Sequence, residues 1–288
     1  MQLHNTNYVI ASLSREVKDG RIMENANQLT IRMFGKFEML YREQPLKLGH
    51  SQTTKAMRLL QLLLFHGEEG VHRSEIVQHL FGVDAEGNIQ NNLKVIVHNL
   101  RKILDQSGLP ENSGISVKAG IYHFTADCDM IIDAKEFENL ADQAKNTAGE
   151  EKYRLLKEAC RIYQGHFLPE IYGDDWVVVN SARYQKIYTE CVKTLAAMME
   201  EKGQYKELYE ISHQAAVLYP LDEWQVYEME ALVNMGEVKE AMDLYDKTTA
   251  MYFEELSMPP SDRMMECFRN MRDQIHMNLR LPLKRIII

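Results

Sequence analysis

The chain has 288 residues, of which 45% are hydrophobic and 26% are charged. This length accommodates two domains of ordinary size, and the composition is typical of a globular protein with a hydrophobic core. The longest apolar runs, such as Leu59–Phe65, are far shorter than the roughly 20 residues that a membrane-spanning helix requires. The first residues lack the cationic start and long apolar block of a secretory signal, so we expect a cytoplasmic protein without membrane association.

The net charge of −9 is unevenly distributed along the chain. Residues 29–125 contain 11 Lys and Arg against 9 Asp and Glu, whereas residues 126–288 contain 19 against 30. A polyanion such as nucleic acid would therefore meet the first segment and be repelled by the second. Because the excess of cations in the first segment is small, its weight depends on where those cations lie.

The sequence lacks the motifs of metal binding and of catalysis. Its four cysteines are widely spaced and form no CxxC pair: Cys128, Cys160, Cys191 and Cys267. This spacing predicts free thiols in a reducing compartment rather than disulfides or a zinc site. There is no phosphate-binding loop, dinucleotide-binding glycine motif or nucleophile elbow. We therefore expect neither an enzyme nor a bound metal or cofactor.

The first part of the chain predicts an arm, short strands and two helices. Residues 1–28 show no clear periodicity and are predicted to form an N-terminal arm, with an extra element docked on the first domain as the alternative. Leu29–Leu48 alternates in polarity and is rich in strand-forming residues, which predicts short strands. A helix is predicted over Thr53–His66, followed by glycines, and a second helix over Arg73–Phe81.

The next segment, Asn88–Leu104, predicts an amphipathic helix with two distinct faces. Its apolar residues recur at helical spacing on one side: Ile89, Leu93, Ile96, Val97, Leu100, Ile103 and Leu104. The opposite side carries amides, cations, a histidine and one valine: Asn91, Asn92, Lys94, Val95, His98, Asn99, Arg101 and Lys102. This outward side contains no carboxylate, although acids outnumber bases in the whole chain. We call the segment the polar-faced helix.

A hairpin is predicted after the polar-faced helix, over Ile115–Thr125, with its turn at Lys118-Ala119-Gly120. Strands, two helices, a polar-faced helix and a hairpin together predict an α+β winged helix-turn-helix domain over residues 29–127. The hairpin would be the wing of this domain, with Lys118 at its tip. Tyr122 is expected to pack in the core rather than to support the tip.

A helix of this kind fits the major groove of B-DNA, where its side chains reach base edges and phosphates. The candidates for base contacts are Asn91, Asn92, Val95, His98 and Asn99. The candidates for phosphate contacts are the nearby cations Lys55, Lys94, Arg101, Lys102 and Lys118. Taken alone, the polar face is more typical of an ordinary solvated helix, whereas its neighbouring elements favour DNA recognition.

Residues 128–288 predict an all-α domain. Seven helices are expected: Ala134–Lys145, Gly149–Tyr163, Trp176–Lys202, Tyr205–Tyr219, Glu223–Asn234, Val238–Glu254 and Ser261–Leu279. Gly203 and Gly236 lie 33 residues apart and each separates two helices, which is nearly the spacing of tetratricopeptide repeats. We therefore predict a tetratricopeptide-like array with a concave surface. The turn-rich segment Gln164–Trp176 suits either a ligand loop or a packed corner between helices, and we expect the corner.

From about Leu29 to Asp273 the chain resembles transcriptional activators of the Streptomyces antibiotic regulatory protein type. The resemblance rests on LTIRMFGKFEML, TTKAMRLLQLLLFH, NNLKVIVHNLRKIL and KAGIYHF at the front. At the rear it rests on IIDAKEFENL, YQGHFLPEIYGDDWVVVNSARY and EELSMPPSDRMMECFRNM. It implies an OmpR-type winged helix followed by a helical bacterial transcriptional activation domain, without a cofactor.

The resemblance also implies partners. It implies that two or more protomers bind direct repeats of double-stranded DNA near a promoter and activate transcription by contacting RNA polymerase. In OmpR-type proteins the loop before the recognition helix makes that contact, which here corresponds to Gly82, Val83, Asp84, Ala85, Glu86 and Gly87. A small effector on the helical domain is a further possibility that the array leaves open.

We interpret the chain as a sequence-specific DNA-binding transcriptional regulator that acts as an activator. Two alternatives are kept. In the first, the protein is a repeat-based adaptor whose winged helix binds protein instead of DNA. In the second, the helical domain is a sensor whose aromatic residues line a small-molecule site, although at helical spacing those residues are expected in the core.

Overall fold

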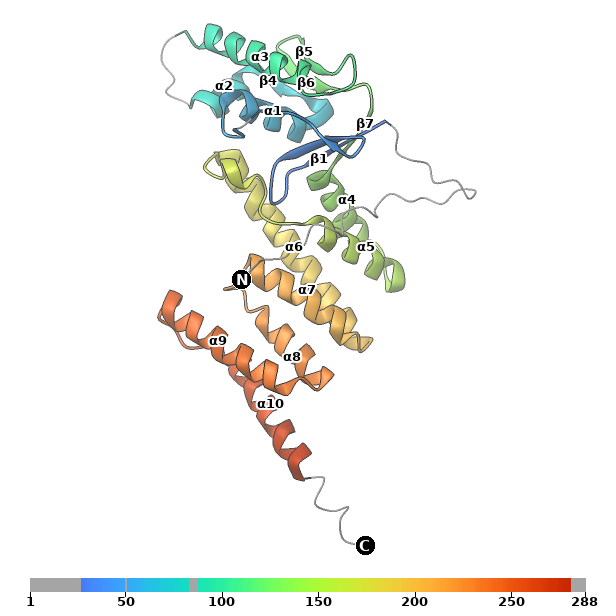
Figure 1. Cartoon of the computed structure of the whole chain (residues 1–288), viewed down its shortest axis with the longest axis vertical. Coiled ribbons are helices and arrows are strands. Elements are labelled where there is room, and N and C mark those ends of the chain that lie inside the picture. Colours follow the sequence, from blue (N-terminus) through green and yellow to red (C-terminus); the bar gives the residue numbers. More distant parts are fainter. Residues whose placement is uncertain (1–26, 50, 83–87, 281–288) are drawn as a thin grey trace, which may run out of the picture. The chain divides into compact units, whose positions relative to one another are not determined.

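Figure 1 shows the computed structural model of the chain, which describes residues 27–49, 51–82 and 88–280. Contacts within the chain divide it into two compact units. The first unit combines residues up to 136 with residues 167–181, and the second combines residues 137–166 with residues from 182 onward. The predicted N-terminal arm lies outside the described residues, apart from its last two positions.

A four-stranded sheet forms one part of the first unit. Its strands, in spatial order, are β3 (Gln44–Pro45), β2 (Glu38–Tyr41), β1 (Gln28–Arg32) and β7 (Asp129–Ile132). β1 runs antiparallel to β2 and parallel to β7, although β7 follows it only after three helices. Alternation in the sequence predicts the first strands, whereas the four residues of β7 are too few to give a recognisable pattern.

Three helices follow: α1 (Lys55–His66), α2 (Arg73–Phe81) and α3 (Ile89–Asp105). The Thr54 side chain caps α1 by accepting the N–H of Met57 at 3.3 Å. A short 3₁₀ turn, η2 (Gly67–Glu69), follows α1. On α3 the buried residues are those of the predicted apolar stripe: Leu93, Ile96, Val97, Leu100 and Leu104. The prediction of the polar-faced helix is therefore confirmed.

A second sheet contains the hairpin, with strands in the order β4 (Val71–His72), β6 (Ile121–Thr125), β5 (Gly114–Lys118). The turn between β5 and β6 has only two residues, Ala119 and Gly120, with φ of 50° and 82°. Two positive φ angles are typical of a type I′ turn, which suits the twist of a hairpin. Lys118, predicted within the turn, instead ends β5 and pairs with Ile121. The layout confirms the predicted winged helix-turn-helix.

Residues 167–181 are an integral part of the first unit. The N–H of Leu168 donates to the carbonyl of Met33 at 2.8 Å, and Phe167 bridges Phe34. The Phe167 ring also lies in a group with Phe65 of α1 and Trp176, with ring centres 5.3–5.9 Å apart. A short 3₁₀ turn, η3 (Pro169–Ile171), lies within the segment. The segment predicted as a corner between helices thus supplies core residues to the α1 side of the first unit.

Asp133 fixes the end of β1 to the start of α4 (Asp133–Lys145). Its carboxylate accepts the N–H groups of Met33 at 2.8 and 2.9 Å, Phe34 at 3.0 Å and Ala134 at 2.7 Å. Burial raises the pKa of Asp133 to about 7. The three N–H donors favour the ionised form and so partly offset this rise.

The second unit is helical. Seven helices lie wholly or mostly within it. They are α4 (Asp133–Lys145), α5 (Gly149–Ile162), α6 (Asp175–Glu201), α7 (Tyr205–Leu218), α8 (Gln225–Met235), α9 (Val238–Leu256) and α10 (Asp262–Arg280). The first residues of α4 and α6 belong to the first unit. Gly203 and Gly236 have φ of 67° and 87°, which glycine adopts without strain, and each separates two successive helices. The predicted helices therefore agree with the structure to within a few residues.

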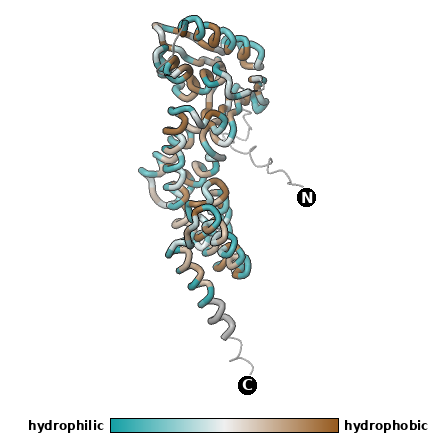
Figure 2. Tube along the Cα trace, turned by 90° about the vertical axis from the view of Figure 1, so that its left-hand side faces the viewer, coloured by the Kyte–Doolittle hydropathy of each residue, from teal (hydrophilic) through white to brown (hydrophobic). Residues whose placement is uncertain are grey.

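Helix α8 packs against α7, α9 and α10, so the later helices form a stack of neighbours. The core of this stack includes Val226, Met229, Met264 and Met271. Figure 2 shows hydrophobic and hydrophilic positions interleaved along these helices, as expected for amphipathic helices that bury one side. The prediction of a tetratricopeptide-like array is confirmed. Within the residues that the structure describes, no helix combines the length and apolar character needed to cross a bilayer.

Candidate nucleic-acid interface

The outward face of α3 is exposed along its whole length. All five candidates for base contacts are exposed: Asn91, Asn92, Val95, His98 and Asn99. Val95 is 51% exposed although it is apolar. The Asn88 side chain accepts the N–H of Asn91 at 3.1 Å and so caps the first turn. The start of α3, where base-reading side chains of a recognition helix are concentrated, is therefore well defined.

Three of the predicted phosphate contacts, Lys94 and Lys102 of α3 and Lys118 of β5, form no ion pair with an acid of the described chain. All three side chains belong to exposed residues. An unpaired exposed cation can neutralise a phosphate without first giving up an internal partner, which favours polyanion binding.

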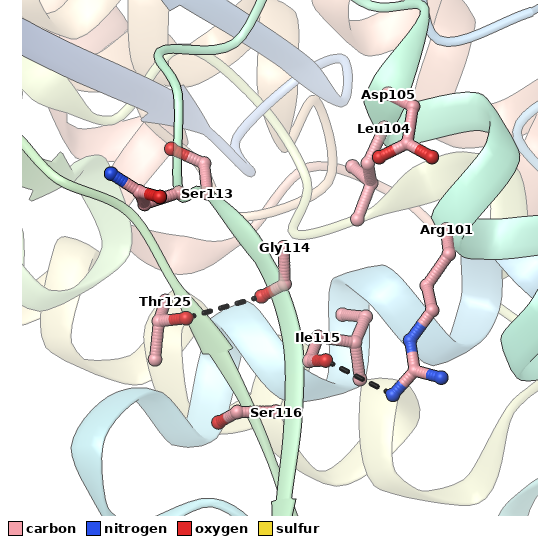
Figure 3. Close-up of a pocket in the computed structure, with 9 residues that line it drawn as sticks. Arg101, Leu104, Asp105, Ser113, Gly114, Ile115, Ser116 and Thr125 are labelled. Carbon is pink, nitrogen blue, oxygen red and sulfur yellow. Dashed lines mark hydrogen bonds between the residues drawn. The ribbon is translucent and has the colours of Figure 1, made fainter.

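Two of the predicted phosphate contacts make contacts inside the chain. The Arg101 Nη2 group donates to the carbonyl oxygen of Ile115 at 3.2 Å and so joins α3 to β5 (Figure 3). The Lys55 ammonium lies 4.0 Å from the centre of the Phe81 ring, a cation–π contact between α1 and α2. From the sequence both residues are simply outward cations, and no local pattern indicates these partners.

The turn of the hairpin is attached to the start of α2. The backbone N–H of Arg73 donates to the carbonyl of Gly120 at 3.0 Å. Next to it, His72 caps α2 by accepting the N–H of Ser74 at 3.3 Å through Nδ1. Lys118, at the end of β5, is exposed beside this attachment. The hairpin thus presents a fixed turn with a cation next to it, as a wing requires.

Three ionisable side chains, His66 of α1 and Glu75 and His79 of α2, lie together where the two helices meet. Glu75 of α2 lies 3.6 Å from His66 at the end of α1 and 3.9 Å from His79. Burial lowers the pKa of His66, and the neighbouring Glu75 carboxylate opposes that shift. Within the described part of the chain, no group of three or more His, Cys, Asp or Glu side chains is arranged to hold a metal ion.

The loop predicted to contact RNA polymerase lies almost entirely outside the described residues. Only Gly82 is described, where it ends α2 with φ of 83° and its N–H donates to the Gln78 carbonyl at 2.9 Å. The remaining positions of that loop, Val83, Asp84, Ala85, Glu86 and Gly87, fall in the gap.

Comparison with protein families assigns both halves of the chain. Residues 49–121 match the family model described as transcriptional regulatory protein, C terminal, and residues 132–272 match the bacterial transcriptional activator domain. The chain belongs to the Streptomyces antibiotic regulatory protein type of activators. Activators of this type are DNA-binding transcription regulators, and the regulator described here has both of their domains in the expected order.

A solved structure supports the fold of this regulator. Mycobacterium tuberculosis EmbR, in complex with a low affinity phosphopeptide, is similar with a TM-score of 0.58 and 15% sequence identity. The match covers 86% of the regulator and 66% of the EmbR chain, so the regulator spans about two thirds of that protein. At this identity the likeness concerns the fold. A comparison with curated proteins gives no match.

Proposed function

We propose that this regulator binds promoter DNA by inserting the outward face of α3 into a major groove. The observation that carries the proposal is the exposed side of α3 from Asn91 to Lys102, which combines amides, unpaired cations and Val95 without a carboxylate. Asp105, the exposed last residue of α3, follows this stretch. In the same unit, the hairpin β5–β6 would lie along the DNA backbone as the wing. Double-stranded DNA is thus the partner that this charge distribution suits best.

We assign the two kinds of contact to two groups of side chains. Asn91, Asn92, Val95, His98 and Asn99 would contact base edges, with the Val95 methyl groups suited to a thymine methyl. Lys94, Lys102 and Lys118 would contact phosphates, since no acid neutralises them in the described chain. Lys55 and Arg101 are assigned weaker phosphate contacts, because each already has a partner inside the chain.

We further propose that several protomers bind direct repeats and that the loop Gly82–Gly87 contacts RNA polymerase. Support for both comes from the family, whose members combine these two domains as transcriptional activators. The helical unit would then supply protein contacts. A small-molecule site among its aromatics is disfavoured at Tyr219 and Trp224, which are 7% and 1% exposed and belong to the core.

The test is binding of the purified protein to fragments of its own upstream region, against a shuffled competitor, at two salt concentrations. We expect saturable binding that resists the competitor and weakens with salt, because phosphate contacts release counterions. Footprint spacing would then report the arrangement of protomers. Negligible binding even at low salt would refute DNA recognition and favour the adaptor interpretation.

A further inference from the structure

Strand β5 forms an edge of its sheet, with β6 on one side only. Because the β5–β6 turn has two residues, Lys118 and Ile121 form a hydrogen-bonded pair, and such pairs recur at every second residue of an antiparallel ladder. The backbone N–H and C=O groups of Ile115 and Val117 therefore point away from β6. They form a row of donors and acceptors along the free edge.

The free edge is only partly covered. The Ile115 carbonyl accepts one hydrogen bond, at 3.2 Å from Arg101 Nη2, which is the contact expected if this carbonyl faces outward. Val117 follows along the same edge and is 43% exposed. An uncovered edge of this kind is a template for pairing with another extended chain.

A hollow of about 350 Å³ lies beside this edge, between β5 and the second half of α3. It is lined by Arg101, Leu104 and Asp105 of α3, by residues 112–116 at the start of the hairpin and by Thr125 at the end of β6. Figure 3 shows Asp105 near the start of β5 and Arg101 beside Ile115. The Ser113 Oγ in its wall is buried without a hydrogen-bond partner. A strand edge facing a helix across a polar hollow is a geometry that accepts an added peptide strand.

We propose that an extended, acidic peptide segment of a partner protein docks here by adding a strand to the free edge of β5. Its backbone would pair with the outward groups of Ile115 and Val117. On binding, a peptide N–H would take over the Ile115 carbonyl and release Arg101 to pair with a peptide carboxylate.

The charges around the edge set the chemistry and the position of this segment. Arg101 lies at Ile115 and Lys118 ends β5 at the turn, so exposed cations border the edge from its second residue onward. Asp105 is the carboxylate of the hollow, and it lies at the opposite end of β5. Acidic side chains of the peptide would therefore lie toward the turn, and an apolar side chain would cover Val117.

Docking at this edge has a consequence that rests on the proposed function. Lys118 and, more weakly, Arg101 are assigned to phosphates, so an acidic strand and DNA would use the same cations. Peptide and DNA would therefore compete, and the partner would act as a negative regulator of DNA binding. The docking itself is measured without DNA, so its failure is distinguishable from a failure of DNA recognition.

The probe is a fluorescein-labelled hexapeptide of alternating valine and glutamate, whose binding to the full chain is followed by fluorescence anisotropy. A peptide of the same charge, N-methylated at alternate backbone nitrogens, is the control, because it cannot form the strand hydrogen bonds. We expect saturable binding of the first peptide and at least tenfold weaker binding of the second. Equal binding of the two would overturn the proposal in favour of charge attraction alone.

Val117→Pro tests the same point on the protein. It removes an N–H that points away from β6, and proline is tolerated at such edge positions. We expect at least tenfold weaker peptide binding, whereas Val117→Ala, which keeps the N–H, changes it less than about threefold. Unchanged peptide binding by a folded Val117→Pro protein, or a loss of DNA binding with peptide binding intact, would overturn the proposal and place DNA backbone at this edge.

Discussion

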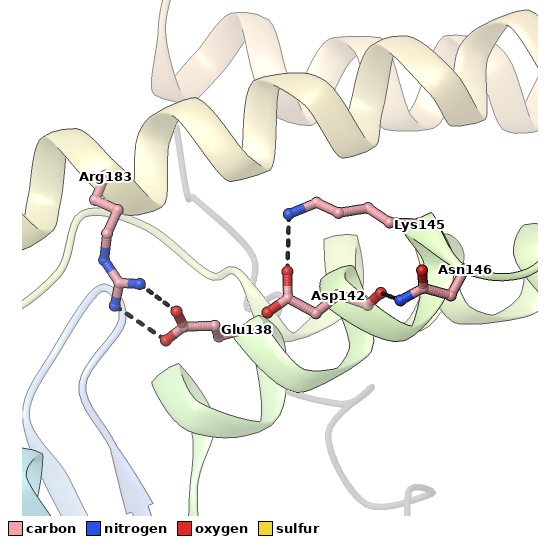
Figure 4. Close-up of polar contacts among 5 residues, drawn as sticks. All are labelled: Glu138, Asp142, Lys145, Asn146 and Arg183. Atoms are coloured by element: carbon pink, nitrogen blue, oxygen red, sulfur yellow. Dashed lines mark hydrogen bonds and ion pairs between the residues drawn. The ribbon is translucent and has the colours of Figure 1, made fainter.

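Cations on α3 differ in their surroundings from five cations on the helices of the second unit. These five are paired with acids: Lys145 with Asp142, Arg154 with Glu151, Arg161 with Glu158, Arg183 with Glu138 and Lys202 with Glu150. Figure 4 shows two of these pairs, in which the carboxylates of Glu138 and Asp142 face Arg183 and Lys145. On α3, Lys94 and Lys102 have no such partner among the described residues.

The difference shows that the number of cations is a poor guide to a nucleic-acid interface. An exposed pair contributes little to stability, about 0–1 kcal/mol, but it cancels the field that a phosphate would meet. Residues 29–125 have an excess of only two cations, and the proposed interface depends on the separation of these cations from acids. Substitutions of paired and unpaired charges test this contrast.

The largest effect is expected at the pair that holds residues 167–181 to α1. Arg58 donates to Asp174 through Nε at 2.8 Å and Nη2 at 2.5 Å, and both side chains are largely buried. Asp174→Ala leaves the guanidinium unpaired and should lower the free energy of unfolding by about 2–4 kcal/mol. Glu150→Ala, which removes the exposed partner of Lys202, should cost less than about 1 kcal/mol.

Urea unfolding followed by tryptophan fluorescence measures both effects, because each unit contains one tryptophan. Trp224→Phe leaves Trp176 as the reporter of the first unit, and Trp176→Phe leaves Trp224 as the reporter of the second. Equal costs for Asp174→Ala and Glu150→Ala would show that the Arg58 pair behaves as an ordinary surface pair.

A second prediction concerns base reading by the exposed amides and histidine of α3. His98→Ala or Asn91→Ala should reduce the preference for the specific site over a shuffled fragment by about 1–3 kcal/mol, because each removes a base contact. Competition binding measures the ratio. Asn270→Ala, an exposed amide on α10, is the matched control and should leave it unchanged. An unaltered ratio in either α3 variant removes that residue from the base contacts.

A smaller effect is expected on the salt dependence of DNA binding, which should differ between substitutions of an unpaired and of a paired lysine. Lys102→Ala should weaken binding to all DNA sequences and reduce the slope of log affinity against log salt by about one unit. Lys145→Ala removes a lysine that is already paired with Asp142 at 2.8 Å, so the slope should not change. Titrations at several salt concentrations give both slopes, and identical slopes for the two variants would refute the contrast.

The smallest effect is expected from pH at the joint between α1 and α2. Burial lowers the pKa of His66 in the folded protein, so folding favours the neutral ring. Its contribution to stability is therefore present above the unfolded value of about 6.5 and is lost as pH falls below it. Between pH 7 and pH 5 the melting temperature should fall about 2 °C more in the native chain than in His66→Gln. A parallel pH dependence in both proteins would contradict this role.

Local patterns in the sequence predict the helices well and the distant contacts poorly. The spacing of Leu93, Ile96, Val97, Leu100 and Leu104 predicts which side of α3 is buried and which is exposed, because this periodicity is contained within one helix. β7 pairs with β1 across three intervening helices, and four residues carry too little alternation to predict a strand. Its place in the sheet depends on partners that no local window contains.

The candidate interface shows the same division. Exposure of Asn91, Val95 and His98 follows from helical periodicity and agrees with the structure. The bond from Arg101 to the Ile115 carbonyl joins a side chain to the backbone of another element, so the sequence shows Arg101 only as an outward cation. For the same reason, the packing of Phe167 and Trp176 against Phe65 of α1 is invisible before the fold is known.

Residues 167–181, which belong to the first unit but come late in the chain, also determine when that unit can finish folding during synthesis. A ribosome releases the strands, the three helices and the hairpin first, but the partners of Arg58 and Phe65 follow about fifty residues later. Until then the α1 side of the nascent unit exposes an aromatic ring and a guanidinium to solvent. The DNA-reading half can therefore complete its core only after α5 has been made, which delays its maturation until part of the helical half exists.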